Sequence, residues 1–147
     1  MLFRSALALP DTPATTEQID AALLTAGREL LTPLGLRTLA HGDPSYLGNY
    51  GGSQLVRDAA YHQGTVWPWP LGAYVELLLR RGQVRQVREA LDGLIAHLWN
   101  AGLGSVSEVF SGDALTPGGC AFQAWSVAEL LRAHVLVFHA EARAGTG

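Results

Sequence analysis

The sequence predicts an all-α fold made of four helices. Apolar residues recur at intervals of three and four in four separate stretches, and helix start and stop signals bound them. No stretch indicates a strand. Two long glycine-rich loops, residues 32–66 and 103–120, precede the second and fourth helices, whereas the turn between the second and third is tight. We therefore expect helical hairpins with short turns at one end and a functional site in the long loops at the other.

The first helix is expected over residues 15–31. Thr15 and Gln18 match a capping box at its start, and Pro33 ends it. Residues 32–66 then contain six glycines and no sustained apolar period. A loop of this length inside a compact domain is usually functional or disordered.

Three further helices follow. Pro68 and Pro70 suit the first turn of the second helix and Gly82 ends it. A third helix begins at once and ends before Gly102, and the fourth is expected over residues 121–140. Their apolar residues repeat at helical spacing: Leu71, Val75, Leu78 and Leu79; then Val84, Val87, Leu91, Leu94, Ile95 and Leu98; then Trp125, Ala128, Leu131, Val135 and Phe138.

The composition indicates one globular domain and excludes several functional classes. The chain has 147 residues, of which 48% are hydrophobic and 16% charged, so disorder is not expected. Ten basic against thirteen acidic residues give a net charge of −3, which argues against nucleic acid or an anionic membrane as partner. No apolar run approaches the roughly 20 residues that span a bilayer. The apolar stretch in residues 1–10 is too short for a signal peptide, and we predict a cytoplasmic protein.

The cysteine and histidine patterns predict neither a metal nor a cofactor. Cys120 is the single cysteine, which excludes an internal disulfide and a cysteine-rich metal site. His62, His97, His134 and His139 lack the spacing of zinc ligands. The glycines form neither of the common phosphate-binding patterns.

The first candidate for a functional segment is a run of nine residues that begins at Tyr61 and ends at Trp69. Tyr61, Trp67 and Trp69 have aromatic faces that can stack on sugar rings. His62 and Gln63 have groups that hydrogen-bond sugar hydroxyls, and a ligand pocket needs this mixture of apolar walls and few polar groups. The alternative is that Trp67 and Trp69 are core residues that anchor the start of a helix.

The second candidate segment holds two acids, Glu108 and Asp113, on the glycine-rich loop before the last helix. A carboxylate in such a loop can serve as a catalytic base. The alternative for Glu108 is a solvated loop glutamate. For Asp113 we favour the alternative of a solvated side chain or a turn residue.

Several segments resemble the C-terminal signatures of glycogen debranching enzymes, in their amylo-α-1,6-glucosidase part. The matching segments are YHQGTVWPW at 61–69, SEVF at 107–110, GC at 119–120 and QAWSVAE at 123–129, with LLTPLGLRTL at 30–39 before them. They occur in the expected order and cover nearly the whole chain. Pro70, Ser111 and the lead-in Met1–Arg4 depart from the family's pattern.

The resemblance implies an (α/α)6 barrel of twelve helices in six hairpins, with the active site in the loops at one end. Residues 1–147 would be a single incomplete segment, the last third of this barrel. In such enzymes one carboxylate protonates the leaving group and another activates water, with inversion at the anomeric carbon. The resemblance assigns Glu108 as general base and places the general acid upstream, outside this chain. The substrate-binding residues that it implies are Tyr61, His62, Gln63, Trp67, Trp69, Gln123 and Trp125.

The resemblance favours a segment of an α-1,6-glucosidase that acts on branch points of limit dextrins, with a branched α-glucan as substrate. Two alternatives stay open: another α/α-barrel glycosidase of the glucoamylase or trehalase type, and a catalytically inactive glucan-binding fragment. Four helices cannot close a ring of six hairpins, so we expect an upstream barrel segment as partner, or self-association. The apolar residues expected to be exposed in the lone chain are Leu71, Val75, Leu91 and Phe138.

Overall fold

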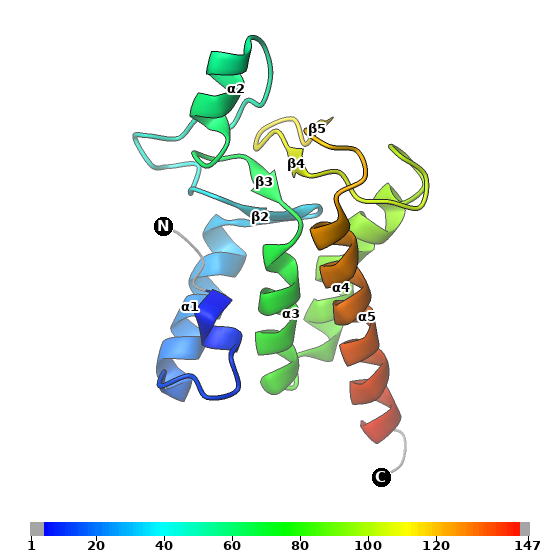
Figure 1. The fold of residues 1–147 in the computed structure, drawn as a ribbon. Helices are drawn as coiled ribbons and strands as arrows, with labels where there is room; N and C mark the ends of the chain where they lie inside the picture. The colour runs from blue at the N-terminus through cyan, green and yellow to red at the C-terminus, as the bar shows by residue number, and fades with distance from the viewer. Residues whose placement is uncertain (1–4, 145–147) are drawn as a thin grey trace.

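The computed structural model describes residues 5–144, in which four long helices stand below a small β-sheet and its loops (Figure 1). The helices are α1 (Thr16–Glu29), α3 (Pro70–Arg80), α4 (Val84–His97) and α5 (Ala124–Ala144), with the shorter η1 (Ser5–Ala8) and α2 (Gln54–Ala60). All four predicted helices are therefore present. The lead-in Met1–Arg4 lies outside the described residues.

The prediction of an all-α fold is wrong, because five short strands form an antiparallel sheet in the order β1-β2-β3-β4-β5. The strands are β1 (Leu31–Thr32), β2 (Gly35–Arg37), β3 (Val66–Trp67), β4 (Val109–Phe110) and β5 (Pro117–Gly118). Each has only two or three residues, which is too short to show the alternation of apolar and polar residues that marks a strand in a sequence.

The sheet joins the two glycine-rich loops. Val66 on β3 pairs with Phe110 on β4, and these residues come from different loops. The guanidinium of Arg37 on β2 reaches across as well, and its Nε and Nη2 donate to the carbonyl oxygen of Gly112 at 3.2 and 2.9 Å. Both candidate segments are therefore held at the same end of the helices (Figure 1).

The sequence signal at the start of α1 forms the expected hydrogen bonds, whereas the N-cap residue of α2, Ser53, makes no side-chain cap hydrogen bond. The hydroxyl of Thr15 accepts from the backbone N–H of Gln18 at 3.3 Å, and the Gln18 side chain accepts from the Thr15 N–H at 2.9 Å, so the predicted capping box is confirmed. Helix α1 ends at Glu29, two residues early, because Leu31 already pairs in the sheet. Helix α2 has seven residues, too few for an apolar period.

Helix α3 is the centre of the core, and η1, α1, α4 and α5 all pack against it. The expectation that Leu71, Val75 and Leu91 are exposed is wrong, since their exposed fractions are 2%, 0% and 2%. Neighbouring helices of this chain already cover them, so they form its own core. Phe138 is 69% exposed, as expected.

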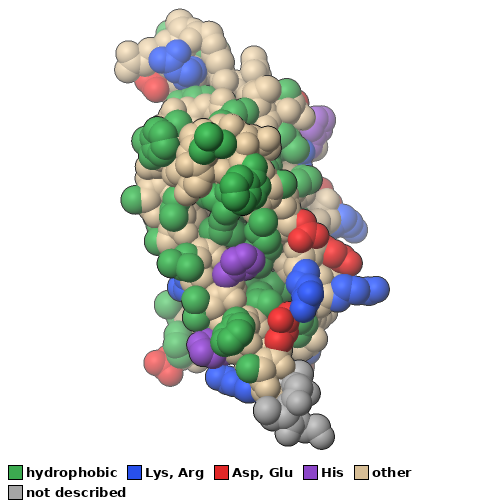
Figure 2. Space-filling view, turned by 90° about the vertical axis from the view of Figure 1, so that its right-hand side faces the viewer, with side chains coloured by type: hydrophobic (Ala, Val, Ile, Leu, Met, Phe, Trp, Pro, Cys, Tyr) green, Lys and Arg blue, Asp and Glu red, His purple; other side chains and the backbone are tan. Residues whose placement is uncertain are grey.

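The exposed apolar surface lies on α5. Leu131, Val135 and Phe138 are exposed along it at intervals of four and three residues, and Trp125 is exposed near its start. Figure 2 shows apolar side chains gathered on this side of the molecule. No helix among residues 5–144 is long and apolar enough to cross a bilayer.

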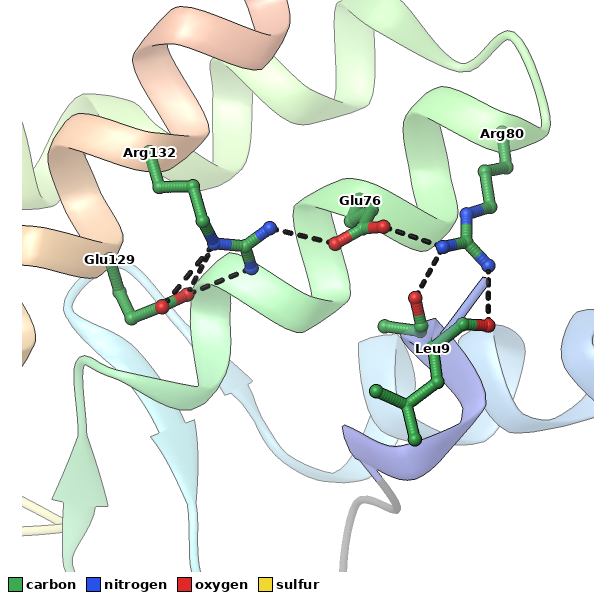
Figure 3. A network of polar contacts seen from close by, with 6 residues as sticks. Leu9, Glu76, Arg80, Glu129 and Arg132 are labelled. Carbon is green, nitrogen blue, oxygen red and sulfur yellow. Dashed lines mark hydrogen bonds and ion pairs between the residues drawn. The ribbon is translucent and has the colours of Figure 1, made fainter. Parts of the chain in front are cut away.

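An ion-pair network fixes α5 to α3 (Figure 3). Arg132 on α5 contacts Glu76 on α3 at 2.7 Å through Nη1 and Glu129 at 2.8 Å through Nη2. The other oxygen of Glu76 contacts Arg80 at 2.5 Å, and Arg80 donates to the carbonyl oxygen of Leu9 at 3.2 Å. Because these four side chains are partly exposed, the network orients the helices more than it stabilises them.

Candidate active site

Glu108 lies at the sheet end of the helices, immediately before β4, with its side chain half-buried. Its backbone N–H donates to the carbonyl oxygen of Cys120, and the Cys120 N–H donates back to Glu108 Oε2, each at 2.8 Å. The other carboxylate oxygen, Oε1, accepts from the hydroxyl of Tyr61. Each oxygen of this carboxylate therefore has a hydrogen-bond donor from a different segment of the chain.

Gly119 makes the contact with Cys120 possible. A Cβ atom at this position would lie 2.4 Å from Glu108 Oε2, far inside van der Waals contact. The residue also has a φ of 66°, a left-handed conformation that glycine adopts without strain. A side chain at position 119 would therefore push the carboxylate away from the Cys120 amide.

Tyr61 is fixed by the turn that follows α2. Its carbonyl oxygen accepts from Trp67 Nε1 at 3.0 Å and from the hydroxyl of Thr65 at 2.7 Å. Its ring meets that of Trp67 edge-on, with centroids 4.8 Å apart. Burial, and then the hydrogen bond to Glu108, raise the pKa of the Tyr61 hydroxyl, which therefore stays protonated as a donor at neutral pH.

The two tryptophans of the first candidate segment have different surroundings. Trp67 is 8% exposed and packs within the sheet, as the core alternative expected. Trp69, at the start of α3, is half-buried and stacks on Trp125 at the start of α5, with ring centroids 4.2 Å apart and planes 17° from parallel. The pair lines an open groove of about 620 Å³ that also contains Glu76 and Arg132.

The remaining predicted binding residues lie at or near the surface of the same end. His62 is exposed and its ring stacks on Trp67 with centroids 5.2 Å apart. Gln63 is exposed as well. Gln123 is half-buried, and its backbone N–H donates to the carbonyl oxygen of Val106 at 3.0 Å. Among the described residues, no hydrogen bond or ring contact joins the Trp69–Trp125 pair to Glu108.

A buried histidine supports the segment that carries Glu108. His97, at the end of α4, is 4% exposed, and its Nε2 lies 3.1 Å from the hydroxyl of Ser107. The backbone N–H of Ser107 also donates to this nitrogen at 3.3 Å, so Nε2 is an acceptor and the ring proton is assigned to Nδ1. Burial lowers the pKa of His97, which keeps the ring neutral and able to accept.

Asp113 has a surface environment. Its carboxylate accepts from the hydroxyl of Tyr46 at 2.8 Å, lies 3.7 Å from His41 and is about half exposed. Ser111, which departs from the family's pattern, is buried, and its hydroxyl accepts from the backbone N–H of Tyr50 at 3.0 Å. Of the two acids, Glu108 thus has the more enclosed and more fully hydrogen-bonded position.

A family model described as amylo-alpha-1,6-glucosidase matches residues 2–132. The chain belongs to this family. The matched range covers most of the chain and includes Glu108 and all the predicted binding residues. The resemblance to the C-terminal part of glycogen debranching enzymes is thereby confirmed, and the family indicates a glycosidase with an oligosaccharide as its class of substrate.

Several supports of Glu108 were missed from the sequence. His97 shows no motif, because its partner Ser107 becomes a neighbour only through the fold. The Cys120 contact uses a backbone amide, which any residue type supplies. Gly119 is part of a matching segment, but the reason that this position requires glycine follows only from the position of the carboxylate.

No group of three or more metal-binding side chains occurs in the described part of the chain.

Proposed function

We propose that this chain is the C-terminal segment of an α-1,6-glucosidase that releases glucose at the branch points of limit dextrins. Glu108 is the general base of this reaction. One observation supports the role: the half-buried Glu108 carboxylate lies at the sheet end of the helices with a hydrogen-bond donor on each oxygen, in a chain of the amylo-alpha-1,6-glucosidase family. A base held in this way has a fixed direction and remaining lone pairs for a water proton.

The proposed reaction proceeds with inversion. A water molecule attacks the anomeric carbon and gives a proton to Glu108, while the bond to the leaving oxygen breaks and that oxygen takes a proton from a general acid. The two carboxyl groups of such a pair lie roughly 6.5–9.5 Å apart, which leaves room for the water. We place the general acid in a segment upstream of this chain, so the assembled enzyme of the proposal is this chain together with that segment.

Aromatic faces supply the proposed sugar contacts. Trp125 is 55% exposed and offers one face to solvent beside Trp69, in a groove of suitable size for a sugar ring. The exposed side chains of His62 and Gln63, together with Gln123, are placed to hydrogen-bond hydroxyls at the same end of the molecule. The location proposed for this reaction is the cytoplasm.

Product analysis on the assembled enzyme tests the proposal. Free glucose should appear from a limit dextrin with single α-1,6-linked glucose branches, and initially as the β-anomer. Much faster hydrolysis of a linear maltooligosaccharide or of trehalose would instead support a glucoamylase-like or trehalase-like enzyme. Glucan binding without any glucose release would support the inactive binding fragment.

A further inference from the structure

We propose that Tyr61 is a positioning residue that holds the Glu108 carboxylate in its reactive orientation, rather than a contact to the sugar. The inference rests on the proposed function of Glu108. It starts from the hydroxyl of Tyr61, which donates to Glu108 Oε1 across 47 positions of the chain. A hydroxyl directed at the carboxylate cannot donate to a sugar hydroxyl at the same time, because a tyrosine has one proton to give.

The backbone and ring of Tyr61 are themselves fixed by neighbouring residues. Its carbonyl oxygen receives two hydrogen bonds, from Trp67 Nε1 and from the hydroxyl of Thr65. Thr65 is fully buried and Trp67 nearly so, and the Trp67 ring packs edge-on against the Tyr61 ring. The hydroxyl therefore reaches Glu108 from a rigid base in the sheet.

The carboxylate is fixed on its other side by the backbone. The Cys120 N–H donates to Oε2 at 2.8 Å, and the missing side chain of Gly119 leaves room for this contact. Two donors on two different oxygens fix the rotation of the carboxylate about its last side-chain bond, which one donor alone would not do. Tyr61 supplies the donor on Oε1, and Tyr61→Phe removes that donor without adding any atom near the carboxylate.

Kinetics of the assembled enzyme give the first test, with Tyr61→Phe. The variant keeps the ring and its packing on Trp67 but loses the donor. A displacement of the base by even about 1 Å can lower the rate on the order of 10²-fold. We expect kcat to fall at least tenfold, with KM and the affinity for an unreactive oligosaccharide unchanged.

The matched control is Tyr46→Phe. It removes a tyrosine hydroxyl that also donates to a carboxylate, but to Asp113, which the proposed reaction does not use. This control should keep kcat within about twofold of the parent. A raised KM with an unchanged kcat in Tyr61→Phe would show that Tyr61 contacts the sugar, and an unchanged kcat and KM would show that its hydroxyl has no role; either result overturns the inference.

Amide hydrogen exchange at Cys120 gives a second test that needs no activity. If Tyr61 holds the carboxylate against the Cys120 N–H, Tyr61→Phe should speed exchange at this amide several-fold in the 147-residue chain. Exchange at Ser111, which bonds elsewhere in the same loop, should stay unchanged. Unchanged exchange at Cys120 would overturn the positioning role of Tyr61.

The two proposals fail in different ways. If Glu108→Gln abolishes hydrolysis and Tyr61→Phe leaves kcat unchanged, the general base stands and the positioning role falls. If Glu108→Gln keeps full activity, the proposed function falls, whatever the result at Cys120.

Discussion

Three separate parts of the chain supply the residues that surround and support Glu108. Tyr61 comes from the turn after α2, Cys120 from the loop before α5, and His97 from the end of α4 through Ser107. No single stretch of sequence contains them all. Substitutions of these residues should therefore affect the reaction and the stability of the fold in separable ways.

Glu108→Gln should abolish glucose release by the assembled enzyme while leaving oligosaccharide binding nearly intact. The amide keeps the size of the side chain but cannot take a proton from water, and general bases contribute about 10²–10⁴-fold in rate. Turnover and binding should be measured on the same preparation, with Asp113→Asn as control. A Glu108→Gln variant that kept more than half of the activity would show that Glu108 is not the general base.

The tryptophans should separate into scaffold and binding residues. Trp67→Ala deletes a buried ring and should lower the free energy of unfolding by roughly 3–5 kcal/mol. Trp125→Ala removes a ring that is 55% exposed, so it should raise KM with little change in melting temperature. If Trp125→Ala changed only the melting temperature, Trp125 would have a structural role and no role in sugar binding.

His97 should make the fold sensitive to acid. Burial holds its pKa below the ordinary value of 6.5, so the unfolded chain takes up a proton before the folded chain does. The stabilising contribution of neutral His97 is present above about pH 6.5 and is lost as the pH falls through the lowered pKa. Urea unfolding at a series of pH values should show stability falling below this point, and falling less steeply in His97→Gln. Equal slopes in the two proteins would contradict this role.

At the scale of elements, the long helices could be predicted and the sheet could not. Helix α4 has five of the six predicted apolar residues, with the sixth, Leu98, at its C-cap, and α1 has a complete capping box, so local signals are sufficient to predict both helices. The strands have no such local signal. β3 and β4 have two residues each and form only because they pair with each other across distant parts of the chain. The resemblance predicts Glu108 as the candidate base, whereas the hydrogen bonds from Tyr61 and Cys120 to its carboxylate join distant segments, and no sequence pattern predicts them.

The loop between β5 and α5 carries a prediction at this scale. Gly119→Ala should lower kcat strongly, because the added Cβ would lie 2.4 Å from Glu108 Oε2. Gly104→Ala is the matched control, since Gly104 also has a positive φ, of 82°, but its Cβ would meet nothing within 4 Å. Both variants should lose a similar amount of stability from backbone strain, on the order of 1 kcal/mol. Equal activity losses in the two variants would show that strain, and not the carboxylate, is responsible.

At the scale of the whole molecule, the chain has a core of its own and still exposes an apolar face. Helix α3 is covered by α1, α4 and α5, which explains why Leu71 and Val75 are buried in the lone chain. The face of α5 that carries Leu131 and Phe138 has no such cover among the described residues. We therefore expect the lone chain to fold and to self-associate through this apolar face.

We therefore predict that the 147-residue chain by itself releases no glucose and self-associates as its concentration rises. It would lack activity because inverting hydrolysis needs two carboxyl groups and the general acid is placed outside the chain. It would associate because Leu131, Val135 and Phe138 form an exposed apolar row on α5, and a patch of this kind promotes contact between molecules. Leu131→Glu combined with Phe138→Glu should shift size-exclusion elution toward the monomer, whereas Leu24→Glu, at an exposed apolar position on α1, should not. A parent chain that stays monomeric at high concentration and releases glucose from a branched dextrin would show that it needs neither a covering partner nor an upstream general acid.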